Sequence, residues 1–409
     1  MHNSAADQDI SYIAPDFASS PEILRGFSLI DSGTIAGSDA EVVRICEIPA
    51  PPFKEHARAA YVRRRMEQIG LAVRQDQIGN VFAARPGRAK SQPVIVSAHL
   101  DTVFPEDTDV RVRREGARLW APGISDNACG VASLLALAEV LQHANITTDG
   151  PVYFVGTVGE EGEGNLRGVR HLFTEGEFKD GAGAFVSLDG PGLERITNRA
   201  LGSRRYKVTI EGPGGHSWAD FGIVNPVHAL GRAIAKFAAY QPPISPRTSF
   251  NVGVIEGGSS VNAIPDRASM LVDIRSMSKY EIDKLEAHLR RSVDGAIREE
   301  TAQRSFSGTG LTLSLEMIGD RPSGETPVHS PLVQAALECS RALGIEPRLD
   351  CSSTDSNIPI SLGIPAITIG VGGLSGNCHS LTEWYEPTGR ELGMKRLLIL
   401  TLALAGLAF

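Results

Sequence analysis

The sequence predicts an α/β domain, with helices on both faces of a mainly parallel sheet, that is interrupted by a smaller ferredoxin-like α+β domain. Three observations lead to this fold: a length of 409 residues, short apolar runs that alternate with helical stretches, and a central region with a different pattern. Because one hydrophobic core rarely serves more than about 250–300 residues, a chain of this length is expected to form two domains. Its 42% hydrophobic and 22% charged residues are typical of a globular protein.

The α/β domain is predicted from continuously apolar, β-branched runs separated by stretches rich in Ala and Leu. Such runs suit strands that are buried on both faces of a mainly parallel sheet. The Ala- and Leu-rich stretches favour helices, and the alternation of the two is typical of α/β domains. The predicted strands are residues 93–101, 151–161, 183–190 and 364–370, and the predicted helices are 127–143 and 331–343.

The pattern changes between about residues 200 and 312, where apolar and polar residues alternate along the strands. This alternation is typical of antiparallel strands with one buried face. Two amphipathic stretches complete a β-α-β-β-α order, which predicts a ferredoxin-like sandwich. The strands are 206–212, 249–258 and 268–275, and the helices are 226–240 and 279–299. We therefore expect residues 1–199 and 312–409 to form the α/β domain and residues 200–311 to form the inserted domain.

Charge and terminal composition exclude several classes of protein. A net charge of −8 without any basic stripe argues against nucleic-acid binding. The polar N-terminal residues lack the basic start and apolar stretch of a signal peptide. The apolar run from Leu397 to Phe409 has 13 residues, fewer than the ~20 that span a bilayer, which favours a buried terminal helix over a membrane anchor. Five scattered cysteines without CxxC spacing suit a reducing compartment, so we expect a cytoplasmic protein.

Polar side chains follow the predicted α/β strands, where open α/β sheets bind their ligands. The first group is His99-Leu100-Asp101. Because residues i and i+2 share one face of a strand, Asp101 can lie behind the imidazole of His99 and fix its tautomer. The alternative is a histidine at a strand end followed by an aspartate in a turn.

The second group is the segment Gly123-Ile124-Ser125-Asp126-Asn127, directly before a predicted helix. One interpretation is that Asp126 or Asn127 caps this helix. The other is that the Asp126 carboxylate bridges two cations, with the glycine allowing a close approach of the backbone.

The third group is a pair of adjacent acids, Glu160 and Glu161, after the apolar run at 151–158. Adjacent carboxylates repel one another unless a cation or solvent compensates them. They form either a solvated acidic loop or a site in which one glutamate binds a metal and the other is a general base. Asp189 and His379 complete the set, each following a further apolar strand.

Taken together, these residues predict a metal-dependent hydrolase of amide or peptide bonds. Imidazole combined with carboxylates is the ligand set of a hydrolytic zinc site rather than of a calcium site. Two ions can hold water, polarise a carbonyl and stabilise the tetrahedral oxyanion. An unliganded glutamate beside them can take a proton from the water and return it to the leaving amine.

Five ordered motifs, SAHLDTV, GISDN, VGEEGEG, VSLDG and CHS, resemble the di-zinc peptidase and deacylase superfamily. This superfamily includes peptidase T, carnosinase-type dipeptidases, aminoacylase, glutamate carboxypeptidase and succinyl-diaminopimelate desuccinylase, and the resemblance extends from about residue 37. It implies a cis peptide between Asp126 and Asn127. It also implies two metal ions, the first bound by His99, Asp126 and Asp189 and the second by Asp126, Glu161 and His379. In addition, it implies that Glu160 is the general base and that Asp101 orients His99.

The inserted domain corresponds in this superfamily to a lid that also forms homodimers. The motif GPGGHSW implies that His216 donates to the oxyanion, in its own subunit or across a dimer. SVNAIPD supplies Asn262, and LVDIRS supplies Arg275, whose planar fork suits a substrate carboxylate. STDSN resembles a peptidase T-like substrate loop, in which Asp355 would contact a substrate amine.

Two positions depart from the family pattern. Asn127 stands where a second aspartate is frequent, which removes a charge and keeps a hydrogen-bonding side chain. Cys378 lies beside His379, and we interpret it as a small apolar filler rather than a ligand.

The expected substrates are small peptides or N-acylated amino acids. Within the family, an aspartate at the position of Asp189 goes with aminopeptidases and dipeptidases, so an aminopeptidase or di/tripeptidase is the first expectation. An N-acyl or N-carbamoyl amino-acid amidohydrolase is the second, and a non-catalytic binding relative is the third. Zinc is the first expectation for the two divalent ions, with cobalt or manganese as alternatives, because ligand identity does not select among them. We expect neither a nucleic-acid partner nor a membrane.

Overall fold

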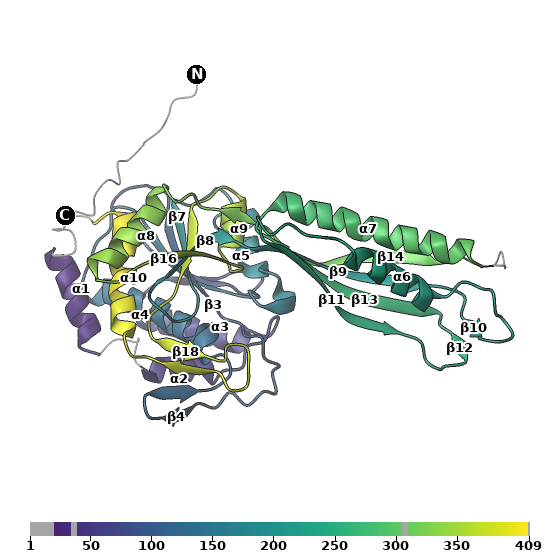
Figure 1. The fold of residues 1–409 in the computed structure, drawn as a ribbon. Helices are drawn as coiled ribbons and strands as arrows, with labels where there is room; N and C mark the ends of the chain where they lie inside the picture. Colours follow the sequence, from purple (N-terminus) through teal and green to yellow (C-terminus); the bar gives the residue numbers. More distant parts are fainter. Residues whose placement is uncertain (1–19, 34–38, 305–309, 408–409) are drawn as a thin grey trace, which may run out of the picture. The chain divides into compact units, whose positions relative to one another are not determined.

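The computed structural model describes residues 20–33, 39–304 and 310–407, which form two compact units (Figure 1). The first unit runs to Ala200 and resumes at Glu325, and the second is Leu201–Gly324. The first has a mainly parallel sheet with helices, and the second is a smaller α+β unit, so the predicted fold class is confirmed.

The second boundary lies later in the chain than the expected residue 312. Strand β14 (Thr312–Arg321) pairs antiparallel with β9 (Gly202–Glu211), so it belongs to the inserted unit. The first residues of β14 alternate in polarity, as half-buried antiparallel strands do, and this alternation could have predicted the pairing. The inserted unit therefore has the order β-α-β-β-α-β, with one strand more than the sequence analysis assigned to it.

The first unit is built on a nine-stranded sheet in the order β1-β2-β6-β3-β7-β17-β8-β15, with β16 paired to β8. The central strands β6, β3, β7 and β17 run parallel, and β1, β2 and β6 pair antiparallel towards one edge. These four central strands are the predicted apolar runs. The strands of this sheet are β1 (Val73–Gln75), β2 (Val81–Arg85), β3 (Val94–His99), β6 (Val152–Thr157), β7 (Ala184–Leu188), β8 (Arg195–Ala200), β15 (Gly324–Glu325), β16 (Arg348–Ser352) and β17 (Ala366–Ile369).

Helices cover both faces of this sheet. On one face, α4 and α10 pack against Val94 and Val96, and on the other α5 and α9 pack around Ile95 and Phe185. Since successive residues of a strand point to opposite faces, Val94 and Ile95 belong to different cores. The helices of the unit are α1 (Pro21–Asp31), α2 (Asp39–Cys46), α3 (His56–Gln68), α4 (Cys129–His143), α5 (Arg167–Thr174), α8 (Pro331–Ala342), α9 (Asn357–Ser361) and α10 (Arg390–Ala405).

A small antiparallel sheet contains β4 (Arg113–Glu115), β5 (Arg118–Trp120), β18 (Leu374–Gly376) and β19 (Trp384–Glu386).

The apolar C-terminal run forms most of α10, and its leucines are largely buried in the first unit. The last two residues of that run, 408 and 409, lie outside the described residues. Among the described residues, one helical stretch, Ile124–His143, is long and apolar enough to cross a membrane, and 89% of its apolar window is buried inside the structure. Such burial is typical of a helix in the core of a folded domain. Helix α4, which makes up most of this stretch, lies in the core of the first unit.

The second unit is a four-stranded antiparallel sheet in the order β11-β13-β9-β14, with α6 and α7 packed on one face (Figure 1). Tyr206, Val208 and Ile210 of β9 point into this core, because every second residue of a strand faces the same side. Beyond β9 and β14, its elements are β10 (Gly215–His216), α6 (Pro226–Ala238), β11 (Thr248–Gly257), β12 (Ala263–Ile264), β13 (Arg267–Ser276) and α7 (Lys279–Ala302).

Three helices begin with a side-chain N-cap that is followed by a proline. Ser20, Asn225 and Ser330 each accept a hydrogen bond from an N–H in the first turn of α1, α6 and α8, and each is followed by a proline. The side chain satisfies a donor that has no partner within the helix, and proline lacks an N–H that would need one. The starts of these helices are therefore determined locally by the sequence.

Candidate metal centre

Two histidines approach opposite oxygens of one aspartate in the first unit. His99 Nε2 lies 3.0 Å from Asp126 Oδ1 and 3.9 Å from Asp189 Oδ1. His379 Nε2 lies 3.0 Å from Asp126 Oδ2 and 3.1 Å from Glu161 Oε1. All five residues expected to bind metal are thus brought together, with Asp126 in the middle.

Parallel strands explain most of this convergence. His99 is the last residue of β3, Asp189 directly follows β7, and Glu161 lies in the loop after β6. Because β6, β3 and β7 are adjacent and parallel, their carboxyl ends lie at the same edge of the sheet. Asp126 comes from the turn before α4, where the Asp126–Asn127 peptide is cis, as expected.

The donor atoms fit metal ions. His99 Nδ1 lies 3.1 Å from the main-chain oxygen of Asp101, so in the neutral imidazole Nδ1 carries the proton and Nε2 presents a lone pair. That lone pair faces carboxylate oxygens, and Asp126 Oδ1 is buried without a hydrogen bond. An array of acceptors directed at one another is unfavourable unless a cation lies among them, and imidazole with carboxylate is a zinc-type donor set.

The electrostatics of the centre support the same interpretation. Burial and the charge of Asp126 raise the pKa of Glu161. Burial opposes the ionisation of Asp126, but positive charge on His379 and His99, when their Nε2 atoms are protonated, holds its pKa well below the usual range. Hydrogen bonds to Asp126, Cys378 and Glu161 raise the pKa of His379. The Asp126 carboxylate therefore requires positive charge beside it, from protonated imidazoles or from a cation bound in place of their protons.

Asp101 lies on the Nδ1 side of His99, where it was expected, and it also has partners that the sequence did not indicate. Its carboxylate oxygens accept hydrogen bonds from the N–H groups of Glu160 at 3.0 Å and of Glu161 at 2.7 Å. Oδ1 lies 3.7 Å from His99 Nδ1, whose nearer partner is the main-chain oxygen of Asp101. Asp101 therefore links His99 to the turn that carries both glutamates. Glu160 itself is 4% exposed.

Asp355 lies beneath this edge of the sheet. It is 1% exposed, and its Oδ2 accepts a hydrogen bond of 2.5 Å from Thr157, which is paired with His99 across β6 and β3. Its Oδ1 is buried without a hydrogen bond, and burial raises the pKa of Asp355 to about 6. A contact between Asp355 and a substrate amine therefore stays a prediction.

His216 and Asn262 are neighbours in the second unit. Strand β10, which ends at His216, pairs with β12, and Ser217 N donates to Asn262 O at 2.9 Å. The exposed ring of His216 accepts hydrogen bonds at Nδ1 from the main chain of Trp218 at 3.2 Å and of Ala219 at 3.3 Å. With Nδ1 an acceptor, the neutral ring carries its proton on Nε2, which is then available as a donor.

Arg275 is not brought beside His216 and Asn262. It lies near the end of β13, which starts at Arg267, so at about 3.3 Å per residue it is roughly 26 Å along the strand from that start. Its Nε donates to Asp273 at 2.7 Å. A role in binding a substrate carboxylate stays a prediction.

Cys378 differs from its expected character as an apolar filler. It is exposed, and its thiol donates to Asp126 Oδ2 at 3.4 Å, so that interpretation is wrong. A cysteine followed by a histidine in a polar turn could have indicated a surface position.

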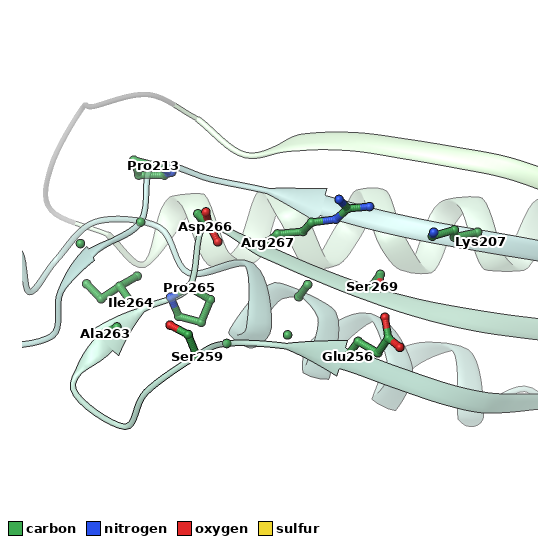
Figure 2. Close-up of a pocket in the computed structure, with 15 residues that line it drawn as sticks. Lys207, Pro213, Glu256, Ser259, Ala263, Ile264, Pro265, Asp266, Arg267 and Ser269 are labelled. Carbon is green, nitrogen blue, oxygen red and sulfur yellow. The ribbon is translucent and has the colours of Figure 1, made fainter.

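A hollow with a volume of about 890 Å³ lies in the second unit (Figure 2). Figure 2 shows charged side chains of both signs around it, including Lys207, Glu256, Asp266 and Arg267. Glu256, Asp266 and Arg267 are exposed, and none of the metal-type clusters among the described residues includes them. The chemistry of the donor atoms, rather than the size of a hollow, identifies the candidate site.

One buried carboxylate close to the centre was missed by sequence reasoning. Glu383 is 0% exposed and accepts hydrogen bonds from the turn that carries Asp126. The sequence feature that could have indicated Glu383 is an acidic residue at the start of a short aromatic strand, four residues after His379.

Known proteins resemble this chain over most of its length. A sequence profile described as Peptidase family M20/M25/M40 matches residues 95–402. A putative succinyl-diaminopimelate desuccinylase from Mycobacterium tuberculosis is 26% identical over 336 residues, which is 80% of this chain and 88% of that protein. The cytosol non-specific dipeptidase of Escherichia coli is 25% identical over 362 residues, which is 78% of this chain and 71% of that protein.

Solved structures share the fold. A tripeptidase from Staphylococcus aureus superposes with a TM-score of 0.74 at 20% identity, covering 90% of this chain and 97% of that chain. A dinuclear metal-binding peptidase of the M20 family from Bacillus subtilis has a TM-score of 0.66 at 16% identity, covering 94% of this chain and 99% of that chain. The similarity therefore extends through both units.

Proposed function

Because the chain belongs to peptidase family M20/M25/M40, we propose that it is a metal-dependent aminopeptidase or di/tripeptidase acting on small free peptides. Hydrolysis of an amide bond in a small substrate is the reaction class of the family. The observation that carries the proposal is the approach of His99 and His379 to opposite oxygens of Asp126. With Asp189 and Glu161 beside them, these residues suit two divalent cations, with zinc as the first choice and cobalt or manganese as alternatives.

His99, Asp126 and Asp189 would hold one ion, and Asp126, Glu161 and His379 would hold the other. Two ions bound there supply positive charge that polarises the substrate carbonyl and acidifies water. In this proposal, Glu160 takes the proton from the attacking water and delivers it to the leaving nitrogen. Asp101 keeps Glu160 and Glu161 in place through their N–H groups and His99 in one tautomer through its main-chain oxygen.

His216 is proposed to donate from Nε2 to the carbonyl oxygen as negative charge develops there. The support is its tautomer, set by two main-chain N–H groups that bind Nδ1, and its exposed ring. Asn262, beside it, and Arg275 are proposed to bind the substrate, with Arg275 the anchor for a carboxylate. Asp355 is proposed to contact a substrate amine.

The second candidate is an N-acyl or N-carbamoyl amino-acid amidohydrolase. It is favoured by the desuccinylase among the relatives, whereas aspartate rather than glutamate at position 189 favours a peptidase. A screen of free di- and tripeptides against N-acetyl, N-succinyl and N-carbamoyl amino acids, with zinc, cobalt or manganese added, separates the two. We expect free peptides to have the higher kcat/KM. Faster turnover of an N-blocked amino acid would support the second candidate, and no hydrolysis of either class would contradict both.

We also propose that the protein acts in the cytoplasm and forms a homodimer through the second unit. The cytoplasmic location is supported by the cytosolic dipeptidase among its relatives. Dimerisation is supported by β11, an edge strand with Val254 42% and Ile255 60% exposed, because an unpaired edge can pair with another strand. Cell fractionation and sedimentation equilibrium test the two statements separately.

A further inference from the structure

Glu383 is a buried carboxylate whose hydrogen bonds all reach one turn. Oε1 accepts from Ser125 N at 2.8 Å, from Ser125 Oγ at 2.7 Å and from Asp126 N at 3.0 Å. Oε2 accepts from Gly123 N at 3.1 Å. A fully buried carboxylate is costly unless hydrogen bonds replace its water, and these donors replace it.

The main chain of Glu383 extends this connection in two directions. Its carbonyl accepts from Ala121 N at 3.1 Å, just before the same turn. Its N–H donates to Ser380 O at 3.1 Å, in the turn that follows His379. Glu383 therefore joins the segment that carries Asp126 to the segment that carries His379, and these two residues lie 3.0 Å apart through Asp126 Oδ2 and His379 Nε2.

The backbone on both sides of this connection needs such support. His379 has φ of 62°, in the left-handed region that is unfavourable for a residue with a side chain. Asp126 and Asn127 interrupt the helical geometry of their turn with φ of −128° and −134°. Ordinary helix hydrogen bonds do not hold such a turn, so the carboxylate of Glu383 supplies the acceptors that its N–H groups lack.

We propose that Glu383 is a positioning residue that holds the Asp126 carboxylate between His99 and His379 and thereby sets the affinity for metal. This inference rests on the proposed function, because it requires that Asp126 binds metal. Glu383 acts through the main chain of residues 123–126 and is not itself a ligand. Groups that orient metal ligands typically change metal affinity by about 10–100-fold when they are replaced.

The test is Glu383→Gln, which keeps the size of the side chain but turns an NH₂ group towards N–H donors. Zinc is titrated calorimetrically into the metal-free protein, with a competing chelator where binding is tight. We expect at least one of two zinc sites to weaken about 10–100-fold, with far-UV circular dichroism unchanged. The matched control is Glu300→Gln, because Glu300 is also 0% exposed but is bonded to Asn225, Arg232 and Arg304 in the second unit. The control is expected to lose stability while keeping wild-type zinc affinity.

Each outcome decides one statement. Zinc affinity of Glu383→Gln within twofold of wild type would overturn the positioning role. Equal weakening in Glu300→Gln would also overturn it, because the effect would then be general destabilisation. If Glu383→Gln does not fold, Ser125→Ala is tested instead, because it removes only the hydroxyl donor to Glu383. We expect the zinc affinity of Ser125→Ala to fall several-fold. An unchanged zinc affinity in this variant would again contradict the positioning role. If the wild type binds fewer than two zinc ions, the di-metal function fails instead.

Discussion

Glu160 and Glu161 are adjacent in the chain, and their N–H groups are held by the two oxygens of the same carboxylate, that of Asp101. Their side chains nevertheless differ in surroundings. Glu161 Oε1 lies 3.1 Å from His379 Nε2, among the proposed ligands. Glu160 is buried beside it, and the metal-type clusters of the described residues do not include it. The two carboxylates are therefore expected to have different functions.

Replacing each glutamate by glutamine separates these functions. Glu161→Gln should weaken one metal site and lower activity in parallel, because it removes a charged ligand. Glu160→Gln should bind two metal ions and lose about 10²–10⁴-fold in kcat, the usual contribution of a general base. Metal analysis beside steady-state kinetics measures both. Loss of metal only in Glu160→Gln would show that the roles are reversed, and full activity in both variants would contradict the mechanism.

His216 offers a second test at the scale of one side chain. If its Nε2 donates to the oxyanion, His216→Ala should lower kcat by about 10²–10³-fold, as for loss of one such donor. Its metal content should stay that of the wild type, because all five proposed ligands belong to the other unit. His228→Ala is the control, since His228 is another exposed histidine of the second unit. Turnover of His216→Ala equal to that of the control would assign His216 a structural role only.

Among the elements, helix α10 is held unusually close to the loop after β17. A Cβ added to Gly393 would lie 2.3 Å from the carbonyl oxygen of Val371, an impossible distance unless the helix moves. Gly231 in α6 is also helical, but it has open space where a Cβ would be added. Glycine is therefore required for packing at the first position and only weakens the helix at the second.

Alanine at these two glycines should change stability in opposite directions. Gly393→Ala should lower the free energy of unfolding by about 1–3 kcal/mol or more, because the clash is with backbone atoms that cannot rotate away. Gly231→Ala should raise it by up to about 1 kcal/mol, the difference in helix propensity between the residues. Chemical denaturation of both variants checks the signs. A Gly393→Ala variant as stable as the wild type would contradict the close approach of α10.

At the scale of the whole molecule, the two units differ in what stabilises them. The first unit contains every proposed metal ligand, whereas the second has its own core between one sheet and two helices. A ligand that binds only the folded state stabilises the part that binds it, by about 4 kcal/mol when its free concentration is 1,000 times Kd. Metal should therefore stabilise one unit selectively.

Removal of metal is expected to move only part of the unfolding profile. In scanning calorimetry, chelation should lower the transition of the first unit and leave that of the second near its original temperature. Re-addition of zinc should restore the first transition. Equal shifts of both transitions would mean that the units unfold together, and no shift would contradict metal binding at the centre.

The sequence by itself determined the four central strands of the first unit, the starts of α6 and α8, and the types of residue at the ends of β3, β6 and β7. These features depend on short-range periodicity, capping residues and strand ends, all of which can be read within a few residues. The assignment of Asp126 as a ligand shared by two metal ions, and the cis peptide after it, came from the resemblance in five ordered motifs. The assignment of the inserted unit was incomplete at one strand, whose alternation was present but whose partner β9 lies about a hundred residues earlier.

Only the tertiary structure decided how Asp126 is held and which groups surround it. Glu383 binds Ser125 across 258 residues of sequence, and no local pattern records such a pair. In the same way, the carboxylate of Asp101 bonds to the glutamate turn rather than lying closest to His99, and Cys378 is exposed rather than filling a gap. Periodicity specifies which face of an element is buried, but a hydrogen bond between distant turns depends on how the elements pack, and packing is decided by the whole chain at once.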